Sequence, residues 1–348
     1  MSNALMERML KAGSIKTAEV LSKSSYFNEK DIIQTSLPIL NVAFSGELTG
    51  GMVSGLTILA GESKSYKTLL SLYCMKAYLD KYEDAIGILY DSEFGITPEY
   101  LIQQGIDPDR VVHIPVEHIE QLKFDIVKRL EEIKRGDKVF TMVDSLGLLP
   151  SKKEVDDAVD EKSVADMTRA KAIRSLFRII TPHLTTKDIP CVVINHVYKT
   201  MEMYAQNVVS GGTAVMLAAN QVFIISRSQD KSSDGSLEGW NFTINIEKSR
   251  FVKEKSKLTF NVNFEKGINI YSGLLDLSLE SGHVVKPKKG YYSRVNIETG
   301  EIEPDSIKEE KTNCKEFWSQ ILTDKKFHKF VKNKFKLTTN NFEIDEDD

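Results

Sequence analysis

The segment GESKSYKT, residues 61–68, contains residues whose types and spacing suit phosphate binding. It matches the pattern G-x-x-x-x-G-K-[ST], except that Tyr66 stands in place of the second glycine. In such a loop, backbone amides surround the phosphates, the lysine reaches the β- and γ-phosphates, and the hydroxyl binds Mg²⁺. The predicted nucleotide-binding residues are therefore Gly61, Glu62, Ser63, Lys64, Ser65, Tyr66, Lys67 and Thr68.

Tyr66 leaves two interpretations open. A side chain is tolerated there if the backbone is near helical and Cβ points away from the phosphates, since the amide of residue 66 remains. Alternatively, the segment is an ordinary polar turn that opens a helix. The flanking residues favour the phosphate loop, because LTILAG (56–61) is typical of a buried strand and KTLLSLYCMKAYL (67–79) of a helix.

Polar side chains also follow three other predicted strands. In chain order they are Asp91, Glu93, Asp144, Asn195 and His196. Asp144 is placed to hold the water shell of Mg²⁺ opposite Thr68, and Glu93 to polarise an attacking water as a general base. Asn195 and His196 are polar groups able to sense the γ-phosphate. Strands often end in Asp or Asn at turns. The carboxyl ends of strands are also where open α/β sheets bind ligands, so together these residues predict an ATP–Mg²⁺ site.

Short β-rich runs alternate with helical stretches along most of the chain. This alternation predicts an α/β fold with a mostly parallel sheet, covered by helices on both faces, whose strands are apolar on both sides. Two later runs alternate more cleanly and predict an antiparallel extension of the sheet. The predicted strands are 56–61, 85–91, 111–116, 138–144, 189–196 and 221–227, the helices are 67–82, 98–105, 117–136 and 163–184, and the extension is 240–249 and 257–264.

The composition excludes several classes of protein. With 348 residues, 41% hydrophobic and 28% charged, the chain is typical of a globular protein of two domains, or of one large core with appendages. No apolar run reaches the roughly 18 residues of a membrane span, and the N-terminus lacks the apolar core of a secretory signal. Cys74, Cys191 and Cys314 predict a reducing compartment, the cytoplasm, without a disulfide framework or a metal cluster. With a net charge of −4, any nucleic-acid site must be a local basic surface.

Taken in order, the motifs resemble those of the RecA-type recombinases. They are GESKSYKT, YDSEFGITPEYL, MVDSLGLLPSKKE, DMTRAKAIRSLFRIITP, INHVY, VVSGGTA, IEKSRFVKEKSK and YSGLLDL, and the resemblance runs from about residue 25 to about residue 320. Within that family the chain is most similar to the UvsX recombinases of T-even-type bacteriophages, in which an aromatic residue precedes the loop lysine. Tyr66 is then a family feature rather than a defect.

The resemblance implies a RecA-like P-loop NTPase core and a DNA-dependent ATPase that uses ATP and Mg²⁺. It implies helical filaments on single-stranded DNA, homology search in duplex DNA and strand exchange, in homologous recombination, recombination-dependent replication and repair. The implied partners are other copies of the chain, a single-strand-binding protein and a loader or mediator, in the cytoplasm of a bacterial host and away from membranes. Two alternatives share the loop and the strand-end acids: a RecA-fold hexameric DNA helicase, and a recombination mediator that has lost hydrolysis.

The resemblance also assigns roles to single residues. Glu93 matches the catalytic glutamate and acts with Lys67, while Asp144 matches the carboxylate that completes the Mg²⁺ site with Thr68. Two further matches are Tyr100, in TPEYL, which stacks on adenine, and His196, which takes the place of a bacterial glutamine coupling the γ-phosphate to the DNA loops.

Lys248 and Arg250 match a cationic pair that reaches the ATP of the neighbouring protomer, where bacterial members have two lysines. Residues two apart at the end of a β run can point the same way, which suits that role. From the residues alone, a solvated basic hairpin turn explains the charged segment EKSRFVKEKSK better.

Two loops are predicted to contact DNA. The first follows the strand that ends at Asp144 and continues into a basic helix, on which the resemblance places Arg169 and Arg174 at the DNA backbone. The second, residues 197–215, is too long for a tight turn. Glycines there let backbone amides approach phosphates, and its candidate residues are Lys199, Gly211, Gly212 and Thr213. The alternatives are a solvated helix face and a disordered surface loop.

The two ends of the chain differ from the core. Tyr26 and Phe27, near the N-terminus, either plug a pocket of a neighbouring copy or close over their own core. A C-terminal helix has lysines on its polar faces, which suit a second DNA molecule for which the acidic tail competes; its apolar face carries Phe327, Phe330, Val331 and Phe335. The predicted segments are 1–35 (N-terminal helix and polymerisation linker), 36–270 (ATPase core), 271–340 (small C-terminal α/β domain) and 341–348 (acidic tail).

Overall fold

The computed structural model describes residues 4–15, 17–24, 31–160, 167–199, 207–232 and 235–338. The chain divides into two compact units, Met1–Asp31 and Ile32–Asp348. In the first unit, helix α1 (Ala4–Ala12) precedes a short 3-10 helix (Leu21–Lys23), and Leu5, Met6 and Met9 of α1 are exposed. The contacts predicted for Tyr26 and Phe27, and the acidic tail, lie outside the described residues.

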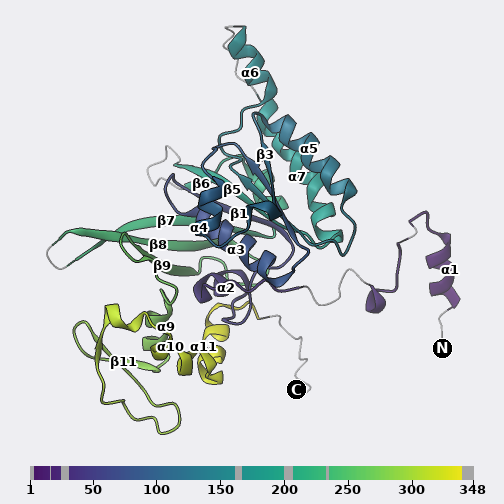
Figure 1. Ribbon diagram of the computed structural model, residues 1–348. Coiled ribbons are helices and arrows are strands. Elements are labelled where there is room, and N and C mark those ends of the chain that lie inside the picture. Colours follow the sequence, from purple (N-terminus) through teal and green to yellow (C-terminus); the bar gives the residue numbers. More distant parts are fainter. Residues whose placement is uncertain are drawn as a thin grey trace. The chain divides into compact units, whose positions relative to one another are not determined.

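A large mixed sheet forms the centre of the second unit (Figure 1). Among the described residues its order is β10-β9-β8-β7-β1-β5-β4-β2-β3, with β6 paired to β5. The strands from β7 to β3 in this order run parallel, and β8, β9 and β10 extend the sheet in antiparallel fashion. The strands are β1 (Gly55–Gly61), β2 (Ile86–Asp91), β3 (Val111–Pro115), β4 (Val139–Asp144), β5 (Pro190–Lys199), β6 (Asn207–Val209), β7 (Gln221–Lys231), β8 (Leu237–Lys248), β9 (Lys257–Asn263) and β10 (Gly267–Ile268). The predicted α/β fold with an antiparallel extension is confirmed.

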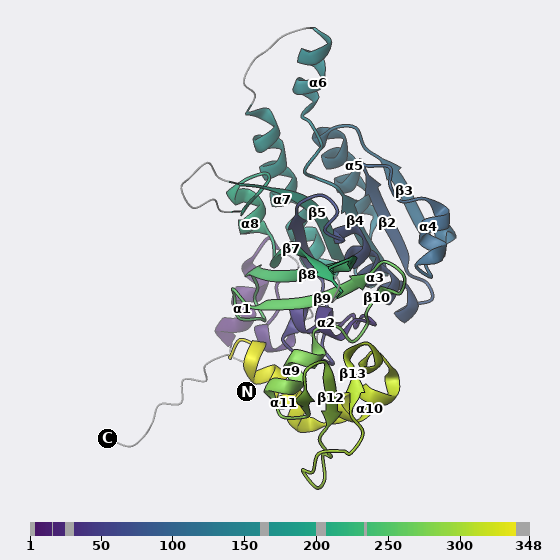
Figure 2. The same ribbon diagram turned by 90° about the vertical axis from the view of Figure 1, so that its left-hand side faces the viewer.

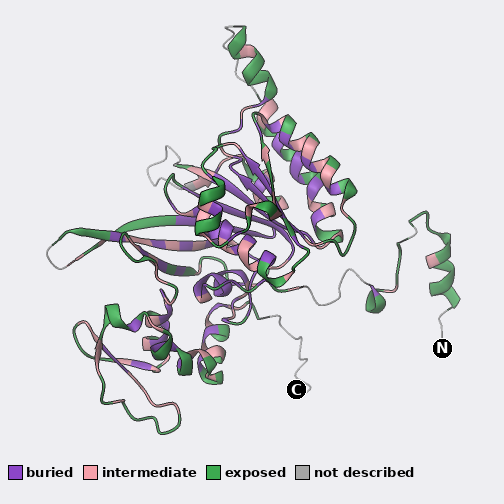
Figure 3. Cartoon of the chain, in the orientation of Figure 1, coloured by how far each residue is buried: buried purple, intermediate pink, exposed green. Residues whose placement is uncertain are grey.

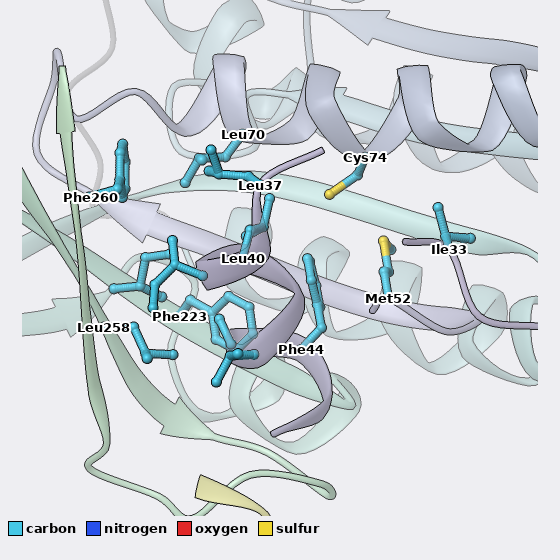
Figure 4. Packing of buried hydrophobic residues seen from close by; sticks show 14 of the residues in the cluster. Ile33, Leu37, Leu40, Phe44, Met52, Leu70, Cys74, Phe223, Leu258 and Phe260 are labelled. Atoms are coloured by element: carbon cyan, nitrogen blue, oxygen red, sulfur yellow. The ribbon is translucent and has the colours of Figure 1, made fainter. Parts of the chain in front are cut away.

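Helices cover both faces of this sheet. Residues of α2 and α3 join one buried cluster, and residues of α5 and α7 join another on the opposite face. Leu40 and Phe44 of α2, Leu70 of α3 and Phe223 of β7 belong to the first cluster (Figure 4), in which the ring centroids of Phe44 and Phe223 are 5.3 Å apart. The helices are α2 (Pro38–Ser45), α3 (Lys67–Lys81), α4 (Pro98–Gln103), α5 (Ile119–Glu132), α6 (Lys152–Val159), α7 (Thr168–Thr186) and α8 (Thr213–Ala218).

Burial varies from the middle of the sheet to its edge (Figure 3). Strands β1 and β4 are buried along their whole length, as expected for strands covered on both faces. The prediction of two-sided burial is wrong for β3, in which Val112 and His113 are exposed. The reason is its position, because β3 is the edge strand beside β2. Helix α6 has no buried residue.

The C-terminal part of the second unit has its own small antiparallel sheet, ordered β11-β12-β13 (Figure 2). In α11, Phe327, Val331 and Phe335 are buried and Phe330 is partly buried, so the predicted apolar face is confirmed. None of the described helices is both long and apolar enough to cross a membrane. The elements are α9 (Leu274–Glu280), β11 (Val284–Lys288), β12 (Tyr291–Arg294), β13 (Ile307–Lys308), α10 (Lys315–Thr323) and α11 (Lys325–Phe335).

Candidate nucleotide and DNA sites

The predicted phosphate loop connects β1 to α3. At its start, a Cβ on Gly61 would lie 2.6 Å from the carbonyl oxygen of Ile225 and 2.7 Å from Ser65 Oγ, so only glycine fits. The Ser65 hydroxyl donates to the carbonyl of Glu62 at 2.8 Å and closes the loop. Lys67 Nζ donates to the carbonyls of Gly61 (3.2 Å) and Glu62 (2.8 Å). Burial lowers the pKa of Lys67, while the negative charges of Glu93 and Asp144 oppose that shift.

Tyr66 does not have the near-helical backbone on which its tolerance was predicted to depend. Its φ of 59° and ψ of 21° are left-handed, a conformation that costs a side chain about 1–2 kcal/mol and costs glycine almost nothing. The ring packs on Phe242 of β8, with ring centroids 4.7 Å apart. Such a pair stabilises by about 0.5–1.5 kcal/mol beyond its burial, which offsets the strain. The loop therefore keeps a glycine-like backbone while Tyr66 anchors it to the antiparallel extension.

Thr68 and Asp144 meet across the site. The Thr68 hydroxyl donates to Asp144 Oδ2 at 2.7 Å, and Asp144 is 4% exposed. Burial raises the pKa of Asp144 to about 6, although the hydrogen bond from Thr68 opposes the shift. Oδ1 of Asp144 is buried without a hydrogen-bond partner among the described residues.

This pair fits Mg²⁺. The ion is commonly held by one or two side chains, and phosphates and water supply its other ligands. Within the part of the chain that the structure describes, no group of three or more His, Cys, Asp or Glu side chains is arranged to hold a metal. The unpartnered oxygen of Asp144 beside a hydroxyl is thus the donor set expected for a magnesium ion shared with a nucleotide, rather than for an ion held by protein alone.

Glu93 lies beside the same pair because the sheet register aligns the strand ends. Asp91 of β2 is paired with Asp144 of β4, and its carboxylate accepts hydrogen bonds from the amides of Glu93 (3.0 Å) and Phe94 (2.7 Å). This fixes the turn that carries Glu93. The Glu93 side chain is 38% exposed, and its Oε1 lies 3.3 Å from His196 Nε2.

Strand β5 brings His196 to the phosphate loop, since His196 is paired with Gly61 of β1. A Cβ on Gly147 would lie 2.4 Å from His196 Cδ2, so the imidazole occupies space that only a glycine leaves. Asn195 behaves differently from the prediction. It is fully buried, its Nδ2 donates to the carbonyl of Ser210 at 2.7 Å, and it does not line the cavity described next. It links the nucleotide side to the segment just before Gly211.

Most of the phosphate loop, together with Glu93, Asp144 and His196, lines one cavity of about 400 Å³, within the usual range for small-molecule sites. Tyr100 lies on its wall at the start of α4, where the Thr97 hydroxyl accepts a hydrogen bond from the Tyr100 amide at 3.2 Å. Arg227 and Trp240 form another part of the wall, with the guanidinium 4.4 Å from the ring centroid. Its lining residues are Ser63, Lys64, Ser65, Tyr66, Lys67, Thr68, Leu69, Glu93, Tyr100, Asp144, Ile194, His196, Arg227, Trp240 and Phe264.

Several groups of this site are not among the residues predicted from the sequence. Arg227 could have been found, because it ends a predicted strand as the other site residues do. Trp240 begins one predicted strand and Phe264 ends another, but both are apolar, and the antiparallel pairing of β8 and β9 is what brings this end of the extension to the cavity. Ser145 follows Asp144 directly, but its contact with Glu93 depends on how two turns meet.

The predicted DNA residues have unlike surroundings. The Arg169 guanidinium donates to the carbonyls of three residues that follow β4: Leu149 (2.6 Å), Leu146 (3.1 Å) and Gly147 (2.9 Å). Arg174, on the same helix, is exposed. In the second loop, Gly211 and Gly212 have positive φ angles of 90° and 71°, and Thr213 begins α8. The Lys199 side chain and residues 161–166 and 200–206 lie outside the described part of the chain.

Lys248 and Arg250, which were predicted to act as a pair, also have different surroundings. Lys248 Nζ donates to the carbonyls at the C-terminal end of α8: Met216 (2.7 Å), Leu217 (3.2 Å) and Ala219 (2.7 Å). Burial, followed by the charge of Arg250, lowers the pKa of Lys248. Arg250 lies beyond the end of β8 and is exposed. Lys248 therefore caps the helix that follows the second predicted DNA loop.

A phosphate loop facing strand-end acids at the carboxyl edge of a parallel sheet defines a P-loop nucleotide-binding α/β protein. Comparison with known proteins gives the family. The RecA N-terminal domain matches residues 6–269, and the C-terminal domain of the bacteriophage T4 recombination and repair protein matches residues 271–331. The chain belongs to the RecA family, and the predicted resemblance to it and to its UvsX members is confirmed.

Individual relatives differ widely in similarity. The recombination and repair protein of Enterobacteria phage T4 is 51% identical over 338 residues, which cover 96% of this chain and 86% of that protein. Protein RecA of Malacoplasma penetrans (strain HF-2) is 25% identical over 301 residues, covering 84% and 87% of the two chains. Protein RecA of Mycoplasma mycoides subsp. mycoides SC is 26% identical over 300 residues, covering 85% and 82%.

Proposed function

We propose that this chain is a DNA-dependent ATPase and strand-exchange recombinase. It forms helical filaments on single-stranded DNA and pairs that strand with homologous duplex DNA, in recombination, recombination-dependent replication and repair of a bacteriophage. The similarity to the T4 recombination and repair protein over 96% of the chain supports the biological role. The arrangement of Lys67, Thr68, Glu93 and Asp144 around one cavity supports the chemistry.

Each of these residues has a distinct task. The amides of the phosphate loop and Lys67 bind the triphosphate, and Tyr100 stacks on the adenine. Thr68 and Asp144 hold Mg²⁺, which when bound neutralises charge on the phosphate oxygens. Glu93 accepts a proton from the attacking water, for which a partly exposed carboxylate beside the loop is suited. His196, within 3.3 Å of Glu93, responds to the γ-phosphate.

Hydrolysis depends on assembly in this proposal. Arg250 and Lys248 reach the nucleotide of an adjacent copy. The guanidinium of Arg250 is exposed, whereas Lys248 must first release the carbonyls at the end of α8. Arg174 and the second loop, with Lys199, Gly211, Gly212 and Thr213, bind the DNA backbone, and Arg169 contributes at the base of the first loop. The positive φ angles of the two glycines support close approach of backbone amides to phosphates.

The segments of the chain and its partners also have roles in this proposal. Residues 1–35 serve polymerisation, 36–270 form the ATPase core, 271–340 form a small C-terminal domain, and 341–348 are an acidic tail. The lysines of α11 bind a second DNA molecule, in competition with that tail. A single-strand-binding protein and a loader or mediator are partners in the cytoplasm of the bacterial host. These assignments extend the family's properties to this chain.

The test is Glu93→Gln, which keeps the shape of the side chain and removes the base. ATP hydrolysis is measured with and without single-stranded DNA, together with nucleotide binding and filament formation by electron microscopy. We expect turnover to fall by roughly 10²- to 10⁴-fold while nucleotide binding and assembly on DNA persist. Undiminished turnover by the variant, or hydrolysis by the unsubstituted chain that ignores DNA, would contradict the proposal. Rings instead of filaments would favour a helicase.

A further inference from the structure

Ser145 is a buried residue whose hydroxyl contacts Glu93. It follows Asp144 at the end of β4 and is 0% exposed. Its Oγ donates to Glu93 Oε1 at 2.6 Å, a short distance typical of a hydroxyl bonded to a carboxylate. The other neighbour of this Oγ is His196 Nε2, at 3.4 Å. Since a serine hydroxyl has one hydrogen and Glu93 receives it, Ser145 can only accept from His196.

The backbone of Ser145 is held independently of its side chain. The Ser145 amide donates to Ser92 Oγ at 2.9 Å, and Ser92 Oγ donates to the Ser145 carbonyl at 2.8 Å. The Ser92 amide donates to the carbonyl of Asp144 at 2.8 Å. These bonds tie the turn after β2 to the turn after β4. They would survive the loss of the Ser145 hydroxyl, so the hydroxyl itself is not needed to join the turns.

Glu93 needs such a contact because of its exposure. A long, partly exposed carboxylate loses side-chain entropy when it is confined to one position, so without a partner it spreads over several rotamers. Ser145 and His196 both contact the same carboxylate oxygen, Oε1. Among the described residues no donor bonds to Oε2, which leaves that oxygen for the water it deprotonates. One hydroxyl thus orients the carboxylate and keeps its second oxygen available.

We propose that Ser145 is a positioning residue for ATP hydrolysis, whose hydroxyl holds Glu93 in the orientation from which it accepts the proton of the attacking water. In the hydrolytic step, water loses a proton to Glu93 and its oxygen bonds to the γ-phosphorus, while the bond from that phosphorus to the bridging oxygen breaks. The leaving oxygen takes both electrons of that bond with ADP. Ser145 exchanges no proton in this step. The inference rests on the proposed function, because it requires Glu93 to be the general base.

The test is Ser145→Ala in the full chain, assayed for ATP hydrolysis with single-stranded DNA. Losing one hydrogen bond to a charged group is expected to lower kcat by roughly 10- to 100-fold. We expect KM, binding of a fluorescent ATP analogue and the thermal unfolding midpoint to stay close to those of the unsubstituted chain. The matched control is Ser278→Ala, which removes a buried hydroxyl of α9 that has no hydrogen-bond partner within the described part of the chain.

A double-mutant cycle separates positioning from other effects. Single-turnover hydrolysis is compared in Glu93→Gln and in Glu93→Gln with Ser145→Ala. If Ser145 acts through Glu93, the second substitution changes nothing further. An equal loss of rate in both backgrounds, an unchanged kcat in the single variant, or a loss of nucleotide binding and a lower unfolding midpoint would overturn the inference. If Glu93→Gln hydrolyses ATP normally, the proposed function fails instead, and the Ser145 single variant is not needed to show it.

Discussion

The nucleotide side and the DNA side of this protein use their polar side chains in different ways. On the nucleotide side, side chains from separate elements bond to each other, Thr68 to Asp144 and Ser145 to Glu93, although Lys67 also bonds to carbonyls of its own loop. On the DNA side, Arg169 bonds to backbone carbonyls of its own chain, and so does Lys248, which caps the helix after the second predicted DNA loop. The first arrangement is a pocket formed before any ligand binds. The second makes two cations part of the scaffold.

The difference follows from the elements that carry these groups. The nucleotide groups stand at the ends of parallel strands, and the register of a buried sheet fixes their spacing. Arg169 lies on a helix that follows an irregular segment, and Lys248 is the last residue of β8, where its amine turns toward the end of α8. Their charges are then satisfied by the nearest carbonyl groups, the residues after β4 for Arg169 and the end of α8 for Lys248. Substituting Arg169 should therefore lower stability as well as DNA binding, whereas substituting Asp144, a pocket group kept for a ligand, should weaken ligand binding without lowering stability.

The largest effect that tests this contrast is expected from Arg169→Ala. Three carbonyls lose a charged donor, and hydrogen bonds to charged groups each contribute about 1.5–3 kcal/mol, with incomplete additivity. We expect the free energy of unfolding of the DNA-free protein to fall by about 3 kcal/mol. Urea unfolding followed by circular dichroism measures it.

Arg174→Ala is the matched control, since Arg174 is on the same helix and exposed. We expect its stability to change by less than about 0.5 kcal/mol, while its affinity for single-stranded DNA falls and depends less steeply on salt. Equal stability of the two variants would remove the contrast and leave Arg169 as a DNA contact only.

The pattern of apolar residues was enough to predict the sheet, its antiparallel extension and the helices around it. It was not enough for β3, whose residues are as apolar as those of an inner strand although it lies at an edge. Edge position is decided by strand order, which depends on contacts between distant segments. The same pattern placed the strand-end acids at one edge of the sheet without specifying which atoms meet.

Three features of the site could not be predicted from the sequence. The left-handed backbone of Tyr66 depends on Phe242, a partner 176 positions away whose ring offsets the strain. The space for His196 depends on Gly147, and the orientation of Glu93 on Ser145. Each of these features arises from packing between distant segments rather than from a motif.

The role of Arg169 could not be predicted from the sequence either. Arg169 looks from the sequence like any basic residue of a helix, because its carbonyl partners have no signature in side-chain types.

The pocket side is tested by Asp144→Asn in the nucleotide-free protein. The folded-state pKa of Asp144, about 6, lies above its ordinary value, so ionisation costs stability as pH rises from about 4 to about 6. A difference of about two pKa units, which already includes the opposing bond from Thr68, corresponds to about 3 kcal/mol. We expect the variant to be more stable than the unsubstituted chain by about 2–3 kcal/mol at pH 8, and by about half as much at pH 5.

The sign of this pH dependence is the informative part. Asparagine does not titrate, so the stability difference should shrink as pH falls and Asp144 becomes protonated in the unsubstituted chain. Thermal unfolding at several pH values measures it, and nucleotide binding in the presence of Mg²⁺ should weaken in the variant at every pH. A variant less stable at pH 8 than at pH 5, relative to the unsubstituted chain, would mean that Asp144 holds the fold together rather than being kept charged for a ligand.

The smallest expected effect distinguishes strain from packing at Tyr66. Tyr66→Ala and Tyr66→Gly both lose the contact with Phe242, but only glycine relaxes the left-handed backbone. We expect both variants to be less stable than the unsubstituted chain, and the glycine variant to exceed the alanine variant by about 1 kcal/mol. Because the loop amides remain, both should still bind nucleotide. Equal stability of the two variants would show that the loop relaxes once the ring is gone, so that the ring itself imposes the backbone conformation a phosphate loop requires.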